Sequence, residues 1–283
     1  MAVPGSEFLS VIYGLASAAS WGAGDFSGGL ATRRTTVYRV IVVSQIAGGL
    51  LLLAAALLLT QAVPSPGNLL LGALAGACGT VGLIALYSGL AQGRMGVVAP
   101  TAAVVTAVLP VVVGIFGDGL PSLRQLAGFG VALVAVWFLA RGDSREPIRL
   151  GDFKLPLIAG IGFGLFVTLI GRVSSESVLW PLIAARCASV ALITLYATYR
   201  RQGIAPQWNH LPLIALAGIL DSGGNALFAL AARAGRLDIS AVLSSLYPAA
   251  TVLLAWLVLH ERLTRPQWLG VIAALVALVL IAL

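Results

Sequence analysis

The chain has 283 residues; 59% of them are hydrophobic, only 10% are charged, and the formal net charge is +7. Soluble domains carry about 25% charged residues, so this composition excludes an ordinary soluble globule. The positive charge comes from arginines scattered over short polar stretches, without the basic face and aromatic platforms that nucleic acids require. We therefore expect the lipid bilayer as a partner and no nucleic acid.

Taken in chain order, the apolar residues form blocks of about twenty, the length of helix that crosses a hydrocarbon core of about 30 Å. The predicted membrane helices cover residues 8–30, 36–60, 68–91, 96–117, 122–141, 155–173, 177–199, 209–233, 238–259 and 264–283. Only the connection at residues 142–154 is longer than a short loop, and none could fold into a soluble domain. The sequence predicts an all-α integral membrane protein with ten transmembrane helices.

The two halves of the chain resemble each other when the sequence is shifted by 142 residues. Residues 71–140 then align with 213–282 without a gap, with 17 identities in 70 positions. Each half holds five predicted helices, and an odd number places the halves in opposite orientations, as in transporters built from inverted repeats. We predict a first five-helix repeat at 1–141, a linker at 142–154 and a second five-helix repeat at 155–283.

The most specific stretch of the sequence is LSSLYPAATVLLAWLVLHERLTRPQWLGVIAALVALVLI, which begins at Leu243. It resembles the ninth and tenth helices of EamA-type proteins of the drug/metabolite transporter superfamily. Pro248 matches the start of one helix, Glu261 its end, and the Gln-x-x-Gly motif from Gln267 the start of the next; in the first half, Pro110 departs from this register by one turn. The resemblance implies an α-helical carrier with a central cavity between its halves, often exporting amino acids or other metabolites.

The distribution of cations predicts how the chain is oriented, because Lys and Arg in short loops collect on the cytoplasmic side. One side of the predicted helices carries eleven of them, namely Arg33, Arg34, Arg94, Arg141, Arg145, Arg149, Lys154, Arg200, Arg201, Arg262 and Arg265. The other side carries four, namely Arg124, Arg172, Arg233 and Arg236. We therefore expect a multi-pass protein of the cell inner membrane with both termini periplasmic, although many EamA relatives have cytoplasmic termini.

Two charged residues and an asparagine lie deep inside the predicted seventh and eighth helices. A charge at the centre of a membrane helix costs about 2.5–3.5 kcal/mol and usually faces a cavity or a partner. Asp221 and Asn225 share one face of the eighth helix, and Arg186 lies at a similar depth in the antiparallel seventh helix. Arg186 and Asp221 either form an ion pair that only fixes packing, or line the substrate cavity, where Arg186 would clamp a carboxylate and Asp221 an ammonium group or a coupling proton.

Other side chains are candidates for contacts with the substrate or for a gate. Aromatic rings can stack on a substrate, and hydroxyl groups beside the expected Pro248 kink can bind it or satisfy the helix itself. These candidates are Trp21, Tyr87, Phe163, Ser244, Ser245 and Tyr247. Asp25, toward the cytoplasmic end of the first helix, is expected to form a structural or gating salt bridge with Arg39 at the start of the second.

No catalytic residue, metal ion or cofactor is predicted. Residues 22–25, GAGD, match the GxGD string of intramembrane aspartyl proteases, with Asp221 as the second carboxylate. Such a pair must share a proton at close range, whereas counting along the helices puts Asp25 and Asp221 about 26 Å and 12 Å from the outer surface. His210 and His260 lie at opposite helix ends, and an HExxH zinc motif is absent.

Together, these features favour a secondary transporter. We expect it to move a small metabolite, first of all an amino acid and aromatic ones included, by alternating access around a midplane cavity, with export as the direction. Protons are one candidate for the driving ion. A channel-like facilitator is the alternative function and an intramembrane protease a remote one, and both a monomer and a dimer remain open.

Overall fold

Each apolar block folds into helix in the computed structural model, which describes residues 4–91, 95–139, 153–205, 208–260 and 264–282. The blocks are rich in Ala and Leu, which are strong helix formers, and in lipid a helix satisfies every backbone polar group within the segment. The helices of the first half are α1 (Pro4–Thr32), α2 (Val37–Leu58), α3 (Pro66–Ala91), α4 (Met95–Asp118) and α5 (Leu123–Leu139). Most of the predicted linker at 142–154 lies outside the described residues.

The second half begins with α6 and ends with α11. Its elements are α6 (Lys154–Val173), α7 (Leu179–Tyr199), a short 3-10 helix η2 (Trp208–His210), α8 (Leu211–Ala234), α9 (Leu237–Ser244), α10 (Tyr247–Leu259) and α11 (Arg265–Ala282). The predicted span at 238–259 is one apolar stretch of membrane length, Leu237–Leu259, and a turn at Ser245 and Leu246, beside the expected kink, divides it into α9 and α10. The cause is Pro248, which has no N–H to continue the ladder of hydrogen bonds; the flanking Leu246 and Ala249 amides bond three residues back instead.

The composition of these helices fits a bilayer. Helical stretches long and apolar enough to cross a membrane are Val37–Leu58, Pro66–Leu86, Lys154–Val173, Leu179–Tyr199, Leu211–Ala234 and Leu237–Leu259. Large apolar side chains on the outside, such as Leu58 at 84% and Phe116 at 87% exposure, would be unfavourable in water and suit contact with lipid. The chain is therefore a multi-pass helical membrane protein, and the number of ten crossings stays a prediction.

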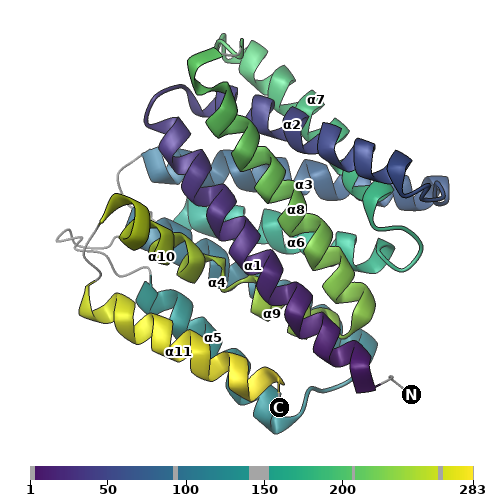
Figure 1. Ribbon diagram of the computed structural model, residues 1–283, viewed down its shortest axis with the longest axis vertical. Coiled ribbons are helices and arrows are strands. Elements are labelled where there is room, and N and C mark those ends of the chain that lie inside the picture. The colour runs from purple at the N-terminus through teal and green to yellow at the C-terminus, as the bar shows by residue number, and fades with distance from the viewer. Residues whose placement is uncertain (1–3, 92–94, 140–152, 206–207, 261–263, 283) are drawn as a thin grey trace.

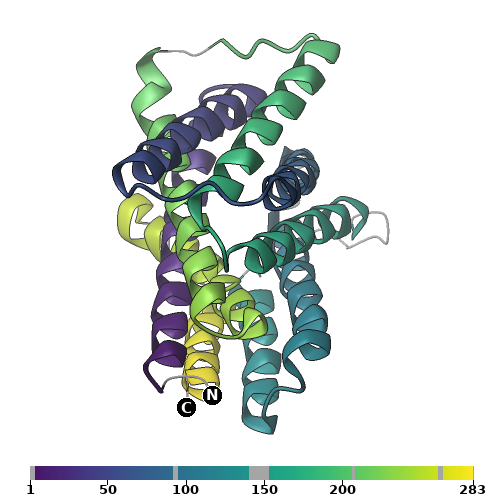
Figure 2. The same cartoon turned by 90° about the vertical axis from the view of Figure 1, so that its right-hand side faces the viewer.

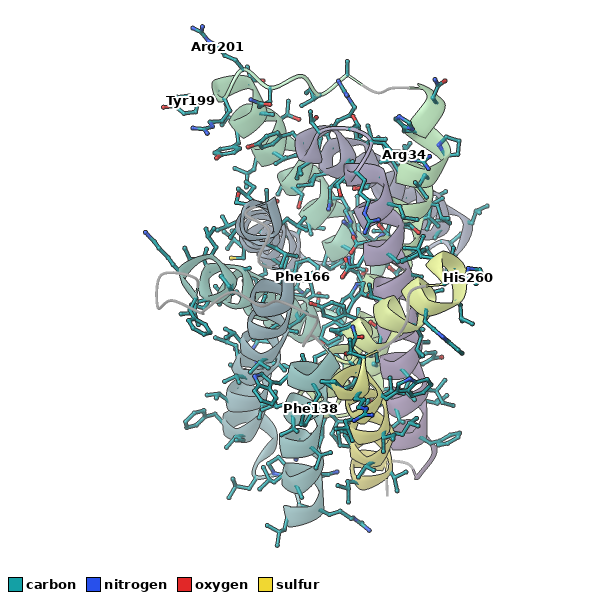
Figure 3. All side chains as sticks on the ribbon, turned by 90° about the vertical axis from the view of Figure 1, so that its left-hand side faces the viewer. Arg34, Phe138, Phe166, Tyr199, Arg201 and His260 are labelled. Atoms are coloured by element: carbon teal, nitrogen blue, oxygen red, sulfur yellow. The ribbon has the colours of Figure 1, made fainter. Side chains whose placement is uncertain are left out.

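Helices from the two halves pack against each other throughout the molecule. α1 lies along α8, α3 along α6 and α5 along α11, while α2 contacts both α7 and α8 (Figure 1). The start of α1 and the end of α11 lie at one end of the molecule (Figures 1 and 2), and the α7–α8 connection lies at the other. Figure 3 shows Arg34 and Arg201 together at this second end.

Small residues allow the closest of these helix contacts. A Cβ atom at Gly76 of α3 would collide with the backbone of Ala185 in α7, and one at Gly218 of α8 with the backbone of Ser44 in α2. In lipid, where no hydrophobic effect drives helices together, such close backbone packing is a main source of association. The two contacts hold α2, α3, α7 and α8 around the space in which the candidate site lies.

Candidate functional site: a central cavity

A cavity with charged and aromatic walls lies between helices of both halves. The volume open to the centres of water molecules is about 110 Å³. Since one water molecule needs only about 10–15 Å³ of such volume, the cavity has room for several waters or for part of a small solute. The lining includes Trp21, Asp25, Gln45, Phe163, Phe166, Arg186, Asp221, Asn225 and Tyr247. In Figure 3, Phe166 lies near the centre of the molecule, far from the peripheral His260.

Arg186 and Asp221 meet in the wall of this cavity. Arg186 Nη2 donates to Asp221 Oδ2 over 2.6 Å, and Arg186 Nη1 donates to Gln45 Oε1 over 2.5 Å. The Arg186 side chain is only 8% exposed, whereas 42% of the Asp221 side chain is exposed. The two charges form an ion pair, and both residues also line the cavity; a role in packing alone and a role in substrate binding both stay predictions.

Trp21 joins the polar and the aromatic parts of the wall. Its indole N–H donates to Asn225 Oδ1 over 3.0 Å, its ring is stacked with Phe228 at a centroid distance of 5.8 Å, and Tyr247 meets it edge-on at 6.4 Å. The ring occupies the space that a Cβ atom at Gly224 would need. Of the predicted aromatic contacts, Trp21, Phe163 and Tyr247 thus reach the cavity.

Asp25 does not pair with Arg39. Arg39 Nη1 donates to Thr35 Oγ1 over 2.6 Å, while Asp25 lines the cavity and has no hydrogen bond or ion pair with any residue that the structure describes. The expectation failed because α1 packs mainly along α8 and has little contact with α2. The rotation of α1 therefore turns Asp25 toward the cavity and the helix that carries Asp221.

The depth assigned to Asp25 was also wrong. α1 and α8 run in opposite directions (Figure 1), and Asp25 precedes the end of α1 by 7 residues while Asp221 follows the start of α8 by 10. At 1.5 Å per residue the carboxylates differ by only about 5 Å in height, and both line the same cavity. A protease dyad is nevertheless a poor match, because Asp221 Oδ2 accepts a hydrogen bond from Arg186, and no hydrogen bond joins Asp25 and Asp221 in the part of the chain that the structure describes.

The two predicted serine ligands lie away from the cavity. Ser244 Oγ donates to the Gly14 carbonyl over 3.3 Å and Ser245 Oγ to the Val242 carbonyl over 2.7 Å, and both residues are buried. Their hydroxyls therefore satisfy helix backbone, which was the alternative to substrate binding. The side chain of Tyr87 lies outside the part of the structure that is described.

Gln45 and Phe166 line the cavity but were not among the residues predicted from the sequence. Gln45 is 5% exposed in the largely apolar α2 and accepts a hydrogen bond from Arg186. Phe166 lies one helical turn after Phe163 on the cavity side of α6. A lone amide in an apolar membrane helix was the available signal for Gln45, since it needs a buried partner. Phe166 is indistinguishable in sequence from a lipid-facing phenylalanine.

The cavity continues toward one end of the molecule. A second, smaller cavity shares Asp25, Gln45 and Asp221 with it and reaches Gly28 and Val40, near the α1–α2 connection. This is the end of the molecule where Figure 3 shows Arg34. The site thus extends toward the end that carries the arginines.

Toward the chain ends, a polar contact joins the two halves. Arg236, between α8 and α9, donates to both carboxylate oxygens of the fully buried Asp238, at 3.1 and 2.8 Å. Arg236 Nη2 also donates to the carbonyl of Gly119, between α4 and α5, over 2.7 Å. The contact ties the α8–α9 connection to the α4–α5 connection, which lies beside the chain ends in Figure 1.

Comparisons with known proteins agree with this arrangement. Residues 150–283 match the sequence profile of the EamA-like transporter family, which confirms the resemblance expected from the sequence. A solved structure described as "Crystal structure of protein" superposes with a TM-score of 0.80 at 14% identity, covering 96% of this chain and 95% of that chain; this likeness concerns the fold alone. Curated protein sequences give no significant match.

Proposed function

We propose that this chain, whose residues 150–283 match the EamA-like transporter family, is a membrane transporter of small solutes, and more closely a secondary transporter that works by alternating access. The observation that carries the proposal is the central cavity, which is built from helices of both halves and continues toward the arginine-rich end of the molecule. A carrier needs a site that is open to one side at a time, whereas an open pore would reach both sides. We infer that the present conformation is the one open toward the arginine-rich end.

The inverted repeat is part of this proposal, with 1–141 and 155–283 as the two repeats. Two equivalent contacts support it. A Cβ at Gly22 of α1 would clash with Ala250 and the Thr251 amide, and one at Gly164 of α6 would press on Leu109 and Thr106. The shift of 142 residues carries Gly22 to Gly164 and Leu109 to Thr251, so the register found in the sequence also relates contacts in space.

For the substrate we propose a small metabolite with an ammonium group, with amino acids, aromatic ones included, as the first candidates. The carboxylates of the cavity favour a positive group and its rings favour an apolar one. The residues assigned to binding are Trp21, Phe163, Arg186, Asp221, Asn225 and Tyr247. We further propose export across the cell inner membrane, protons as the driving ion, and periplasmic termini.

Counterflow in proteoliposomes tests the proposal. Vesicles loaded with one unlabelled amino acid are diluted into the same labelled compound, and a panel is scanned in this way. A carrier accumulates label transiently, because exchange through its site is faster than net flux, and its initial rate saturates with concentration. A facilitator of the channel type gives neither transient accumulation nor saturation, and that result would replace the carrier with the alternative function.

A further inference from the structure

The guanidinium of Arg186 is already occupied. Its two terminal nitrogens bond Gln45 and Asp221 at 2.5 and 2.6 Å, and its side chain is nearly inaccessible. An arginine that binds a substrate carboxylate needs free donors in a forked arrangement. Arg186 therefore neutralises Asp221 and offers little to an incoming anion.

Asp25 is left as the carboxylate without a cation. Among the described residues that line the cavity, the charged ones are Asp25, Arg186 and Asp221, so one negative charge is not balanced when both carboxylates are ionised. Asp25 has no hydrogen-bond or ion-pair partner in the described part of the chain. A charge held inside a membrane protein without a partner usually marks the place of a ligand.

Aromatic rings line the same cavity as this carboxylate. Trp21 lies one helical turn before Asp25 on the same face of α1, and Phe163 and Phe166 line the cavity from α6. An ammonium group is attracted both by a carboxylate and by the face of an aromatic ring, and the rings also offer contact area to an apolar substituent. The carboxylate and the rings together therefore suit a single molecule that carries both an ammonium group and an apolar substituent.

We propose that Asp25 binds the ammonium group of the transported solute, so that the cavity selects organic monocations, amines with an aromatic or apolar tail, over zwitterions and anions of the same skeleton. This rests on the proposed carrier function and assigns its substrate class. An amino acid fits the site through its ammonium group but leaves its carboxylate near Asp221 without a free cationic partner. The corresponding amine lacks that carboxylate and binds more tightly.

Three compounds with one skeleton test the charge preference: 2-phenylethylamine, phenylalanine and 3-phenylpropionate. Their affinities for the purified protein in detergent are measured by titration calorimetry. We expect the amine to bind at least about tenfold more tightly than phenylalanine, a difference of about 1.4 kcal/mol, and the anion not to bind. Phenylalanine binding as tightly as the amine, or no binding of the amine at all, overturns the proposal, whereas counterflow of any solute still supports the carrier function.

Two variants locate the preference at Asp25. Asp25→Asn should weaken amine binding at least about tenfold and bring it close to phenylalanine binding, while Glu176→Gln, which removes an exposed carboxylate in the α6–α7 connection, should leave the affinity unchanged. Monodisperse elution of each variant shows that it is folded, and Asp25→Glu keeps the charge if the asparagine variant fails to fold. If the Asp25→Asn protein binds the amine normally but its transport no longer depends on a pH gradient, Asp25 carries the coupling proton rather than the ammonium group, and the proposal is overturned.

Discussion

Arg186 of α7 and Asp221 of α8 form an ion pair of 2.6 Å in the wall of the central cavity, and Gln45 of α2 binds the same guanidinium. The arginine thus links three helices at the site itself. Because Arg186 is buried and Asp221 is partly open to the cavity, the pair belongs both to the framework and to the surface that a solute meets. Separating these two roles needs single and double substitutions.

Asp221→Asn should destabilise the protein by about 1–3 kcal/mol, since it leaves the buried Arg186 without its counter-ion. The value is below the range of fully buried pairs because 42% of the Asp221 side chain is exposed. Thermal unfolding in detergent measures the loss.

The double variant Arg186→Gln, Asp221→Asn is the matched control. It removes both charges and should recover most of the stability lost in the single variant. If the double variant is stable and inactive in counterflow, the pair acts on the solute; if it is stable and active, the pair is framework alone. A single variant that transports at the normal rate would remove Asp221 from the proposed binding residues.

Gly76→Ala should lower the yield of folded protein sharply. The added methyl group meets the backbone of Ala185, which cannot rotate aside, and overpacking of this kind costs about 1–3 kcal/mol or more. Gly130→Ala is the control, because a Cβ atom there finds nothing within 4 Å. Fluorescence-detected size-exclusion chromatography compares the yield of monodisperse protein in the two variants. Equal yields would show that α3 can move away from α7 without destabilising the protein.

Arg236→Ala should favour opening toward the chain ends, since it removes the contact from Asp238 and Gly119 that joins the two halves there. Ala241 of α9 is 5% exposed, and a cysteine at this position, with Cys78 and Cys187 replaced by serine, reports the opening. An impermeant maleimide should label it about tenfold faster than in the parent, which corresponds to about 1.4 kcal/mol. Arg233→Ala, at the exposed end of α8, should leave the rate unchanged; faster labelling in both variants would indicate general loosening.

The distribution of arginines predicts that residue 283 faces the periplasm. Alkaline phosphatase fused after this residue should be active and a green fluorescent protein dark, whereas fusions after Arg201 should give the opposite pair of results. The two sites share one chain, so expression is controlled internally. The reverse pattern at both sites would show that the chain has the opposite orientation in the membrane, so that the cavity opens toward the periplasm.

The positions of the helices could be predicted from the sequence, and the faces that they present could not. Apolar blocks of membrane length gave α1 to α11 within a few residues, and the antiparallel course of α7 and α8 was enough to bring Arg186 to Asp221. Asp25 was misplaced because neighbours in sequence are not always neighbours in a bundle, and α1 packs on α8.

Phe166 was not recognised from the sequence for a different reason. Along an apolar helix in lipid, both the buried and the outer face are hydrophobic, so periodicity does not reveal which side faces a cavity. Phe166 could not be told from the outward-facing Phe116 by its surroundings in sequence. Polar residues are the exception because burial demands a partner, which is why Asp221 and Arg186 were found and Gln45 could have been.

The imbalance of two carboxylates against one guanidinium in the cavity has an electrical consequence. If both carboxylates are ionised, the empty site carries one negative charge, and alternating access moves this charge through part of the membrane field. A full crossing changes the energy by about 2.3 kcal/mol per 100 mV, so a negative cell interior drives the empty site to face outward. A bound monocation cancels the charge, and the loaded site then responds to concentration gradients alone. The membrane voltage would therefore set the speed of the return step and leave the loaded step untouched.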